Sequence, residues 1–394
     1  MKKLCIKNFG PISKGFTDSE DGFFDISKLS VFIGEQGAGK SSVAKLISLF
    51  SWLEKHNQKS DERVSLIDST VFADKYLKYH RIDSYLRSDT EIYYVHDNFS
   101  ISFCKNQLRI ESKNKNYIRP KVLYIPAERS FCTAITNPYK VPGLPPSVID
   151  FLSDYYDAVK AQKGNKILLP LNGYEFRFSE ADNMAYISDK NHHYEIKVED
   201  SSSGLQSLTP MYVTINHYLE QLKQSIDERH SELNLYQIVE LKHLSEKKEL
   251  FPEDVKKEQK KIINSNLICV IEEPEQNLFP SSQYDIMMTL LKGFSNLTDN
   301  TLIITTHSPY ILETINNSIY ADTLTKNNKD TRKYISLEQQ ISYDNVSAYS
   351  IQNGEIHSIK DSQLKQINPS SIDFCSQKIS DIYSKLSDIE YGDL

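Results

Sequence analysis

The sequence predicts an α/β fold built around a mixed β-sheet. Leu29 to Ile33 has the pattern of a buried strand that runs straight into a glycine-rich loop, and apolar residues at helical spacing follow from Ser41. Further along, Leu267 to Ile271 and Leu302 to Thr305 are short apolar runs typical of parallel strands, with a helical pattern from Gln283 to Leu291 between them. This alternation predicts a βαβ core.

In the middle of the chain, the apolar residues recur with a different period. Between about residues 91 and 200 apolar and polar residues alternate, as in antiparallel strands, in the segments Phe99 to Phe103, Tyr174 to Phe178 and Tyr194 to Val198. A helical pattern with Ser147 as its expected N-cap interrupts them. We therefore expect an antiparallel β lobe with a helical insertion. Near the C-terminus, Asn353-Gly354 predicts the turn of a hairpin.

Composition excludes several classes of protein. No apolar run approaches the roughly 20 residues of a membrane helix, and no signal peptide is evident, so the sequence favours a cytoplasmic protein without a membrane partner. The 5 cysteines are scattered and never form a Cys-x-x-Cys pair, so neither a disulfide framework nor a zinc site is expected. The net charge of −7 argues against wrapping of nucleic acid by the whole surface but permits a local basic face.

One segment matches the phosphate-loop pattern of glycine, four residues, glycine, lysine and serine: Gly34, Glu35, Gln36, Gly37, Ala38, Gly39, Lys40 and Ser41. Such glycines let successive backbone N–H groups face a phosphate, and the following helix adds its positive end. Lys40 would reach the β- and γ-phosphates of ATP, and Ser41 would ligate Mg²⁺. The predicted nucleotide site comprises these eight residues, the phosphate loop, together with Ser42.

Two adjacent carboxylates, Glu272 and Glu273, end the apolar run that begins at Leu267. Burial of two acids is costly without a cation or a substrate, and this acid pair therefore suggests a site. We interpret Glu272 as a residue of the Mg²⁺ shell and Glu273 as the base that polarises the attacking water. The alternative is a solvated strand end before the turn at Pro274.

Two further segments are weaker signals when each is taken alone. His307 follows the next apolar run, where its imidazole would hydrogen-bond the γ-phosphate or orient the water; the alternative is a structural histidine. Ser203 and Gly204 lie in the serine-glycine segment, Ser201 to Ser207, ahead of a helical pattern. That segment is either a second phosphate contact or only a helix cap.

Together the phosphate loop, the serine-glycine segment, the acid pair and His307 occur in the order and relative spacing of ABC-type ATPase heads. The chain resembles the ABC-like AAA family ATPases related to SMC heads and to the ATPase domain of OLD nucleases. It resembles in particular the stand-alone ATPase subunits of bacterial anti-phage systems, such as PtuA of Septu and AriA of PARIS. Further matching phrases are Lys7 to Ile12, Tyr124 to Arg129 and Ile271 to Leu278.

The resemblance implies a P-loop NTPase fold of ABC type that spans residues 1–394 as one composite head. Its expected parts are an N-terminal lobe with the phosphate loop (1–130), an inserted helix and β-hairpins (131–200), a signature and helical subdomain (201–265), and a C-terminal lobe with the acid pair and His307 (266–394). No TOPRIM nuclease domain is expected, because no suitable cluster of acids follows His307.

The resemblance also implies a head-to-tail dimer, or a higher even-numbered oligomer, in which Ser203 and Gly204 close over ATP held by the partner's phosphate loop. Three positions depart from the family pattern: Leu205 stands where a second glycine is usual, and Asn277 and Phe279 replace frequent histidines. These departures leave the rate of hydrolysis open. Arg129 is expected either near phosphate or as a bridge between strands.

The function implied is an ATP-hydrolysing conformational switch that controls a separate effector, a nuclease or toxin, in anti-phage defence. One alternative is a nucleotide-gated scaffold that sequesters an effector with little hydrolysis; another is a DNA repair or recombination ATPase. A basic segment, Lys105 to Lys121, holds six cations against one acid and is either a contact for nucleic acid or a solvated hairpin face. Residues 208 to 262 are helical in pattern but lack the sustained heptads of a coiled-coil arm.

Overall fold

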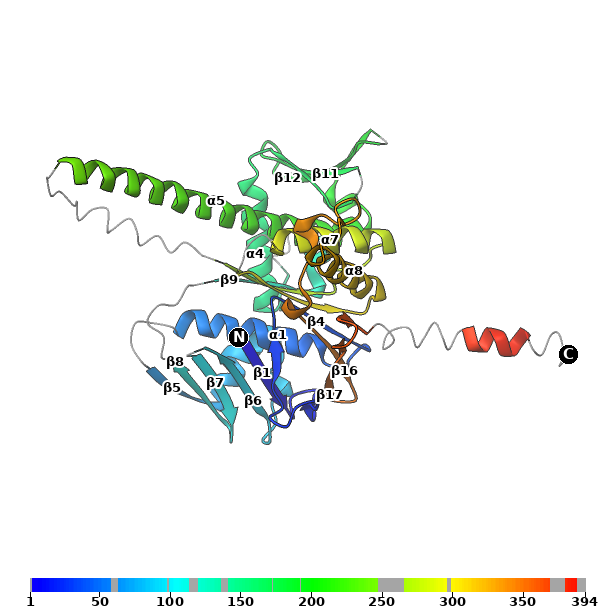
Figure 1. Ribbon diagram of the computed structural model, residues 1–394. Coiled ribbons are helices and arrows are strands. Elements are labelled where there is room, and N and C mark those ends of the chain that lie inside the picture. The colour runs from blue at the N-terminus through cyan, green and yellow to red at the C-terminus, as the bar shows by residue number, and fades with distance from the viewer. Residues whose placement is uncertain are drawn as a thin grey trace.

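A computed structural model describes most of the chain: residues 2–57, 63–97, 99–112, 120–135, 141–171, 173–191, 193–246, 266–295, 299–368 and 380–387. Its centre is a seven-stranded mixed sheet (Figure 1). In spatial order the strands are β2 (Gly15–Phe16), β17 (Glu355–Ser358), β16 (Val346–Gln352), β4 (Leu29–Gly34), β15 (Thr301–Thr306), β14 (Leu267–Glu272) and β9 (Lys121–Ile125).

Neighbouring strands from β16 to β9 run parallel, and β17 pairs antiparallel with β16. The predicted α/β class, the parallel pairing of the two apolar runs and the C-terminal hairpin are therefore confirmed. Helix α7 (Pro280–Ser295) connects β14 to β15, as the helical pattern between them predicted. β14 is buried along its whole length, which explains why its sequence is continuously apolar up to Glu272.

Side chains at alternate positions of the central strands pack into two hydrophobic cores, because successive side chains of a strand point to opposite faces of the sheet. On β14, Ile268 and Val270 join one core, whereas Cys269 and Ile271 join the other. The first core lies under helix α1 (Lys40–Asn57) and a six-stranded antiparallel sheet. In spatial order that sheet comprises β3 (Phe24–Ile26), β1 (Lys2–Lys7), β6 (Glu91–His96), β7 (Phe99–Cys104), β8 (Gln107–Ser112) and β5 (Arg63–Asp68).

The second core lies on the other face of the central sheet, beneath helices α4 (Pro146–Ala161), α5 (Ser203–Glu246), α7 and α8 (Pro309–Lys326) (Figure 1). A four-stranded antiparallel sheet adds to it: β10 (Lys166–Leu168), β11 (Tyr174–Ser179), β12 (Met184–Asp189) and β13 (Tyr194–Lys197). The small pair β18 (Lys360–Asp361) and β19 (Gln366–Ile367) lies near the end. The predicted antiparallel strands and helical insertion are thus confirmed.

Two local expectations are wrong. Helix α4 begins at Pro146 with Pro145 as its N-cap, so Ser147 lies inside the first turn; proline suits this position because its missing N–H would be unpaired there anyway. Helix α5 contains 44 residues and extends beyond the body of the molecule, although the sequence did not predict a long arm (Figure 1). The end of that helical pattern, residues 247–262, lies outside the described residues.

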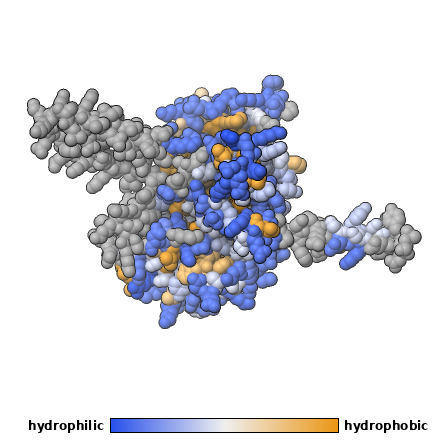
Figure 2. All heavy atoms as spheres, viewed as in Figure 1, coloured by the Kyte–Doolittle hydropathy of each residue, from blue (hydrophilic) through white to orange (hydrophobic). Residues whose placement is uncertain are grey.

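The viewed surface is mostly hydrophilic, with apolar side chains in small separate patches (Figure 2). Exposed apolar residues include Val64 and Leu66 on the edge strand β5. In the described ranges, no helix combines the length and the apolar character that a bilayer span would require.

Candidate nucleotide site

The candidate site lies where three neighbouring strands of the central sheet end. In the parallel register Thr306 of β15 lies opposite Ile33 of β4, and Glu272 of β14 lies opposite Thr305. The phosphate loop, the segment around His307 and the acid pair therefore leave the sheet at the same edge. Ligands of open α/β sheets bind at this carboxyl edge of the strands.

The phosphate loop curls around the side chain of Lys40. The ammonium donates hydrogen bonds of 2.9 Å to the carbonyls of Gly34 and Glu35 and is almost completely buried. Gly39 has a φ of +112°, and a Cβ there would lie 3.0 Å from Cγ of Pro11, so this position requires glycine. Of the other loop positions, Glu35, Gln36 and Gly37 are exposed, Ala38 and Ser41 half-buried, and Ser42 buried.

Glu272 is a buried carboxylate held by its neighbours. The hydroxyl of Tyr124 on β9 donates a 2.8 Å hydrogen bond to its Oε1. Burial raises the pKa of Glu272, and the positive charge of Lys45 together with hydrogen bonds from Tyr124 and Ser41 opposes that shift. Sequence analysis missed Tyr124 and Lys45 as partners, because neither the neighbouring strand nor the inward face of α1 was known.

Glu273 adopts a backbone conformation that glutamate rarely takes, with φ of +47°. Its N–H donates to the carbonyl of Thr305 at 2.9 Å, which ties it to the next strand. Its side chain is one-third exposed, and Oε1 lies 3.5 Å from Nε2 of His307. Such local strain is found preferentially at functional sites, where surrounding contacts hold it in place.

His307 faces both Glu273 and the phosphate loop. Burial and the nearby charge of Lys40 lower the pKa of its imidazole, and Glu273 opposes this. The backbone N–H of His307 donates a 2.7 Å hydrogen bond to Oε1 of Glu275, a third acid that the sequence analysis did not single out. Glu275 is buried enough to raise the pKa of its carboxyl. The only signal in the sequence was its place two residues after the acid pair.

These side chains share one electrostatic environment. Burial lowers the pKa of Lys40, and the carboxylates of Glu273, Glu275 and Glu272 oppose that shift. The same acids also lie near the positive charges of Lys45 and Arg129, so the carboxylates are held among three cations of the chain. The Ser41 hydroxyl, which hydrogen-bonds Glu272, and the carboxylate itself are hard oxygen donors of the kind Mg²⁺ prefers. The residues present therefore fit Mg²⁺.

The serine-glycine segment forms the start of helix α5. Ser203 is exposed, whereas Gly204 is buried so closely that a Cβ would lie 2.7 Å from the carbonyl oxygen of Asn277. Leu205, at the position where the family pattern has glycine, points into the second core. Within the described residues, the hydrogen bonds of this segment reach Arg129, Thr133, Gln276 and the turn before it, and none reaches the phosphate loop of the same chain.

Arg129 connects the start of α5 to the acid pair. It follows β9 on the short helix η4 (Ala127–Ser130) and is fully buried. Its guanidinium donates to the carbonyls of Ser207, Pro126, Glu272 and Glu273. Burial lowers its pKa to about 10, opposed by the surrounding acids, so the side chain stays charged at neutral pH. Of the two roles weighed for Arg129, the structure shows the bridge.

The basic segment is only partly described, because Lys113, Lys115 and Arg119 lie outside the described residues. Arg109 is paired with Glu111, and Lys121 forms a 2.6 Å ion pair with Asp154 of helix α4. Lys121 is therefore engaged with helix α4. Contact with nucleic acid stays a prediction.

Comparison with known proteins found one family model that matches part of the chain. Residues 152–312 match a family model described as an AAA ATPase domain, a stretch that contains the serine-glycine segment, the acid pair and His307. No curated protein matches the chain.

Several solved structures resemble the chain in shape. The SMC head domain from Thermotoga maritima has 11% identity, a TM-score of 0.39, and coverage of 91% of this chain and 97% of that one. The Smc head with an extended coiled coil from Pyrococcus furiosus, bound to the C-terminal domain of ScpA, has 9% identity, a TM-score of 0.42, and coverage of 97% and 100%. A nucleotide-free ATP-binding cassette of an ABC transporter has 10% identity, a TM-score of 0.31, and coverage of 90% of each chain.

The parallel strands with the phosphate loop and the acid pair at their carboxyl edge form an α/β fold of P-loop type. The segment that carries the acid pair and His307 is similar to an AAA ATPase domain.

Proposed function

We propose that this chain binds ATP with Mg²⁺ at the phosphate loop and hydrolyses it. The observation that carries the proposal is the meeting of Lys40, Glu272, Glu273 and His307 at the edge of three parallel strands. Phosphoryl transfer needs little covalent chemistry from a protein, and positioned charges supply most of the catalysis. The site offers an ammonium, a buried carboxylate and an acid–imidazole pair.

Each residue has a proposed role that follows from its surroundings. The buried ammonium of Lys40 would leave the carbonyls of Gly34 and Glu35 to hold the β- and γ-phosphates. Ser41 and Glu272 would hold Mg²⁺, which neutralises charge on the phosphates when bound. Glu273, partly exposed, would orient the attacking water and accept its proton.

His307 would act beside Glu273 as a hydrogen-bond donor to the γ-phosphate. Its lowered pKa favours the neutral imidazole at neutral pH, which donates from one ring nitrogen and accepts at the other. The Nε2 atom lies 3.5 Å from Oε1 of Glu273, and one N–H can donate either to this carboxylate or to the γ-phosphate, so binding of ATP would exchange one acceptor for the other. In this role, contact of His307 with the γ-phosphate would change its contact with Glu273.

We further propose that a second copy completes the site. The exposed Ser203 and the buried Gly204 begin helix α5. Among the described residues, the hydrogen bonds of the serine-glycine segment reach Arg129 and Gln276, close to the acid pair, and not the phosphate loop of the same chain. Ser203 would therefore contact ATP bound to another copy, with the whole chain acting as one composite head. ATP would then stabilise the dimer in proportion to its occupancy.

The biological role we propose is a switch in anti-phage defence that controls a separate nuclease or toxin. Support for this part is the resemblance of the motif set to stand-alone ATPase subunits of such systems. Closure on ATP and opening after hydrolysis would present two different surfaces to the effector, which is how a nucleotide shifts a population between states.

The composite site has a direct test by mixing two inactive variants. Lys40→Ala removes the phosphate-loop ammonium, and Ser203→Arg blocks the exposed start of α5. Each homodimer would be inactive, but a mixed dimer would contain one site with both halves intact. Recovery of ATP hydrolysis on mixing supports the proposal; no recovery, with each variant folded and Ser203→Arg still binding ATP, contradicts a site shared between copies.

A further inference from the structure

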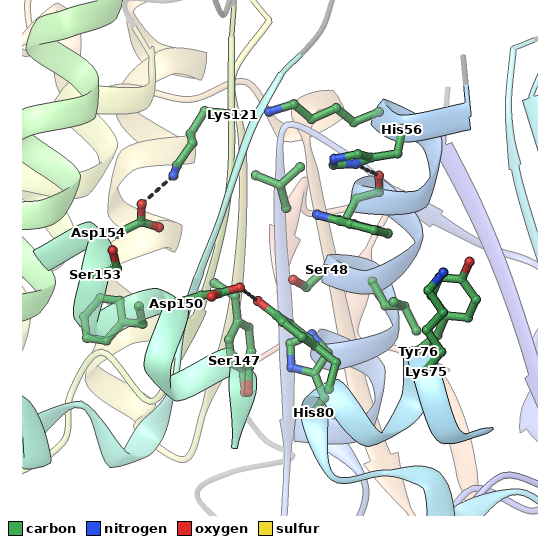
Figure 3. A pocket seen from close by; sticks show the side chains of 17 residues that line it. Ser48, His56, Lys75, Tyr76, His80, Lys121, Ser147, Asp150, Ser153 and Asp154 are labelled. Carbon is green, nitrogen blue, oxygen red and sulfur yellow. Dashed lines mark hydrogen bonds and ion pairs between the residues drawn. The ribbon is translucent and has the colours of Figure 1, made fainter. Parts of the chain in front are cut away.

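A cavity lies outside the candidate nucleotide site, and its lining includes no residue of the phosphate loop or the acid pair. It has a volume of about 370 Å³. Its walls come from α1, from the turn formed by η1 (Phe72–Leu77) and η2 (Lys78–His80), from β9 and from the first turns of α4 (Figure 3). Its walls combine aromatic and aliphatic side chains with lysines, aspartates, serines and histidines, and its size is in the range of small-molecule sites.

The strongest indication of a ligand is His80 in the wall of this cavity. Its side chain is only 2% exposed, and neither ring nitrogen has a hydrogen-bond partner. Nearly all buried polar groups in proteins are paired, so an imidazole with two unsatisfied nitrogens requires an explanation. A neutral imidazole presents one donor and one acceptor, and burial with the nearby charge of Lys45 keeps it neutral by lowering its pKa to about 3.

Aromatic side chains surround this unpaired edge. The ring of Tyr124 meets that of His80 edge-on with 4.5 Å between centroids, and Tyr79 does so at 4.7 Å. On the outer side Trp52 is 41% exposed and stacks on His56 with centroids 3.9 Å apart. Flat aromatic walls around a donor–acceptor edge suit a planar heterocycle, because such rings stack and also hydrogen-bond along their edges.

The lining has one more lysine than aspartate, because it holds Lys55, Lys75 and Lys121 against Asp150 and Asp154. Asp150 accepts a 2.6 Å hydrogen bond from Tyr79, and Asp154 pairs with Lys121 at 2.6 Å and accepts from Tyr218. Both carboxylates are thus engaged by the protein itself. Lys75, exposed on η1, and Lys55 on α1 add positive charge beside Trp52. This combination favours a ligand with one anionic group.

We propose that this cavity binds a nucleoside monophosphate, with the base edge on His80, the base among the tyrosines and Trp52, and the phosphate near Lys75. The same chemistry is carried by a free mononucleotide and by the terminal nucleotide of a strand. The site differs from the phosphate loop, which recognises the β- and γ-phosphates that a monophosphate lacks.

The cavity touches the acid pair through one side chain. Tyr124 contacts His80 with its ring and donates its hydroxyl to Glu272. A bound nucleotide would therefore lie against the residue that orients Glu272. The binding proposal does not depend on ATP hydrolysis, and it stands or fails separately from the proposed function.

The chain provides its own probe, because Trp52 is the only tryptophan among 394 residues. Titration of the full chain with AMP, GMP, CMP and UMP should change the tryptophan fluorescence saturably with at least one of them. A 5′-phosphorylated tetranucleotide, run in parallel, distinguishes a strand end from a free nucleotide. The Lys40→Ala variant should give the same titration, because the phosphate loop is not involved.

Two variants test the assigned contacts. His80→Phe keeps the ring and removes both nitrogens, so it should weaken binding at least tenfold while the protein stays folded. Val122→Phe fills the cavity from β9 and should abolish binding without removing a polar partner. This variant also tests the proposal if His80→Phe does not fold. Lys75→Ala should weaken the nucleotide more than the corresponding nucleoside.

Three results would overturn the proposal. The first is the lack of a saturable change with every monophosphate and with the tetranucleotide. The second is loss of the signal in Lys40→Ala, which would locate the ligand at the phosphate loop. The third is an unchanged affinity in both His80→Phe and Val122→Phe.

Discussion

Arg129 donates a 2.6 Å hydrogen bond from Nη1 to the main-chain carbonyl of Glu272. The same guanidinium reaches the carbonyl of Ser207 at the start of α5. One buried side chain thus joins the acid pair to the serine-glycine segment. A shift of α5 relative to the central sheet would have to pull on the backbone of the acid pair, which links the two halves of the proposed dimer site within one chain.

Replacement of Arg129 should therefore be costly. Arg129→Met keeps much of the volume but leaves buried carbonyls of four residues without this donor, so the free energy of unfolding should fall by about 3 kcal/mol or more. Arg332→Met is the matched control, because Arg332 is exposed and its described partner is Asp330. Chemical denaturation measures both. Equal stability of the two variants would contradict the bridging role.

Tyr124→Phe should show whether Tyr124 orients Glu272 in addition to stabilising the fold. Loss of one buried hydrogen bond costs about 1–2 kcal/mol. Because Glu272 would lose the donor that orients it, the Mg²⁺ concentration for half-maximal ATP hydrolysis should also rise about tenfold.

The control for this experiment is Tyr349→Phe on β16, whose hydroxyl donates to the carbonyl of Asp25 at 2.9 Å and accepts from the N–H of Asp25 at 3.0 Å, away from the acid pair. It should lower stability by a similar amount and leave the Mg²⁺ requirement unchanged. A Mg²⁺ requirement that moves equally in both variants would show that Tyr124 acts only on stability.

Two helical glycines with the same clearance should respond differently to alanine. A Cβ at Gly204 would lie 2.7 Å from the backbone oxygen of Asn277, whereas at Gly293 it would lie 2.7 Å from the flexible end of Leu219. Gly204→Ala must push backbone aside and should cost about 1–3 kcal/mol. Gly293→Ala should be neutral or stabilising by up to about 1 kcal/mol, because alanine favours the helix and Leu219 moves. Thermal unfolding of both variants measures these changes in stability. A Gly204→Ala variant as stable as the wild type would contradict the close contact with Asn277.

His80 should make the fold sensitive to acid. Burial, with the charge of Lys45, lowers the pKa of His80 to about 3 in the native state, below its ordinary value of 6.5. Between these values the unfolded chain binds the extra proton, so this contribution to stability is lost as the pH falls, by at most about 1.4 kcal/mol per pH unit. Relative to His80→Phe, the wild type should lose stability from pH 6.5 to pH 4.

His357 offers a control of opposite sign. Its hydrogen bonds to Asp18 and Glu355 raise its pKa, so the stability it adds is present below pH 6.5 and disappears as the pH rises through the raised value. His357→Gln should therefore weaken the fold more at pH 5.5 than at pH 8. A His80→Phe variant whose pH dependence equals that of the wild type would show that His80 is not buried as a neutral ring.

Local patterns in the sequence predicted the elements that meet at the site. The strand before Gly34, the helix from Lys40 and the fully apolar β14 are each readable from short-range periodicity. Parallel strands share a carboxyl edge, so convergence of their loops also followed. The start of α4 was misplaced, since Ser147 looked like a cap although Pro146 opens the helix.

Contacts between distant segments were not predictable in the same way. Tyr124 precedes Glu272 by 148 residues, and only the pairing of β9 with β14 brings them together. The cavity lined by His80 depends on a turn of π- and 3-10 helix that has no clear periodicity. Glu275 was visible as a third acid, but its bond to the backbone of His307 arises from the fold of the loop.

We propose that Glu273 drives ATP hydrolysis at this site, and phosphate release by Glu273→Gln measures this role directly. The variant should still bind ATP with Mg²⁺ but release phosphate at least about 100-fold more slowly than the wild type. Glu313→Gln, which alters an exposed acid on α8, should keep the wild-type rate. Equal rates for Glu273→Gln and the wild type would contradict the account.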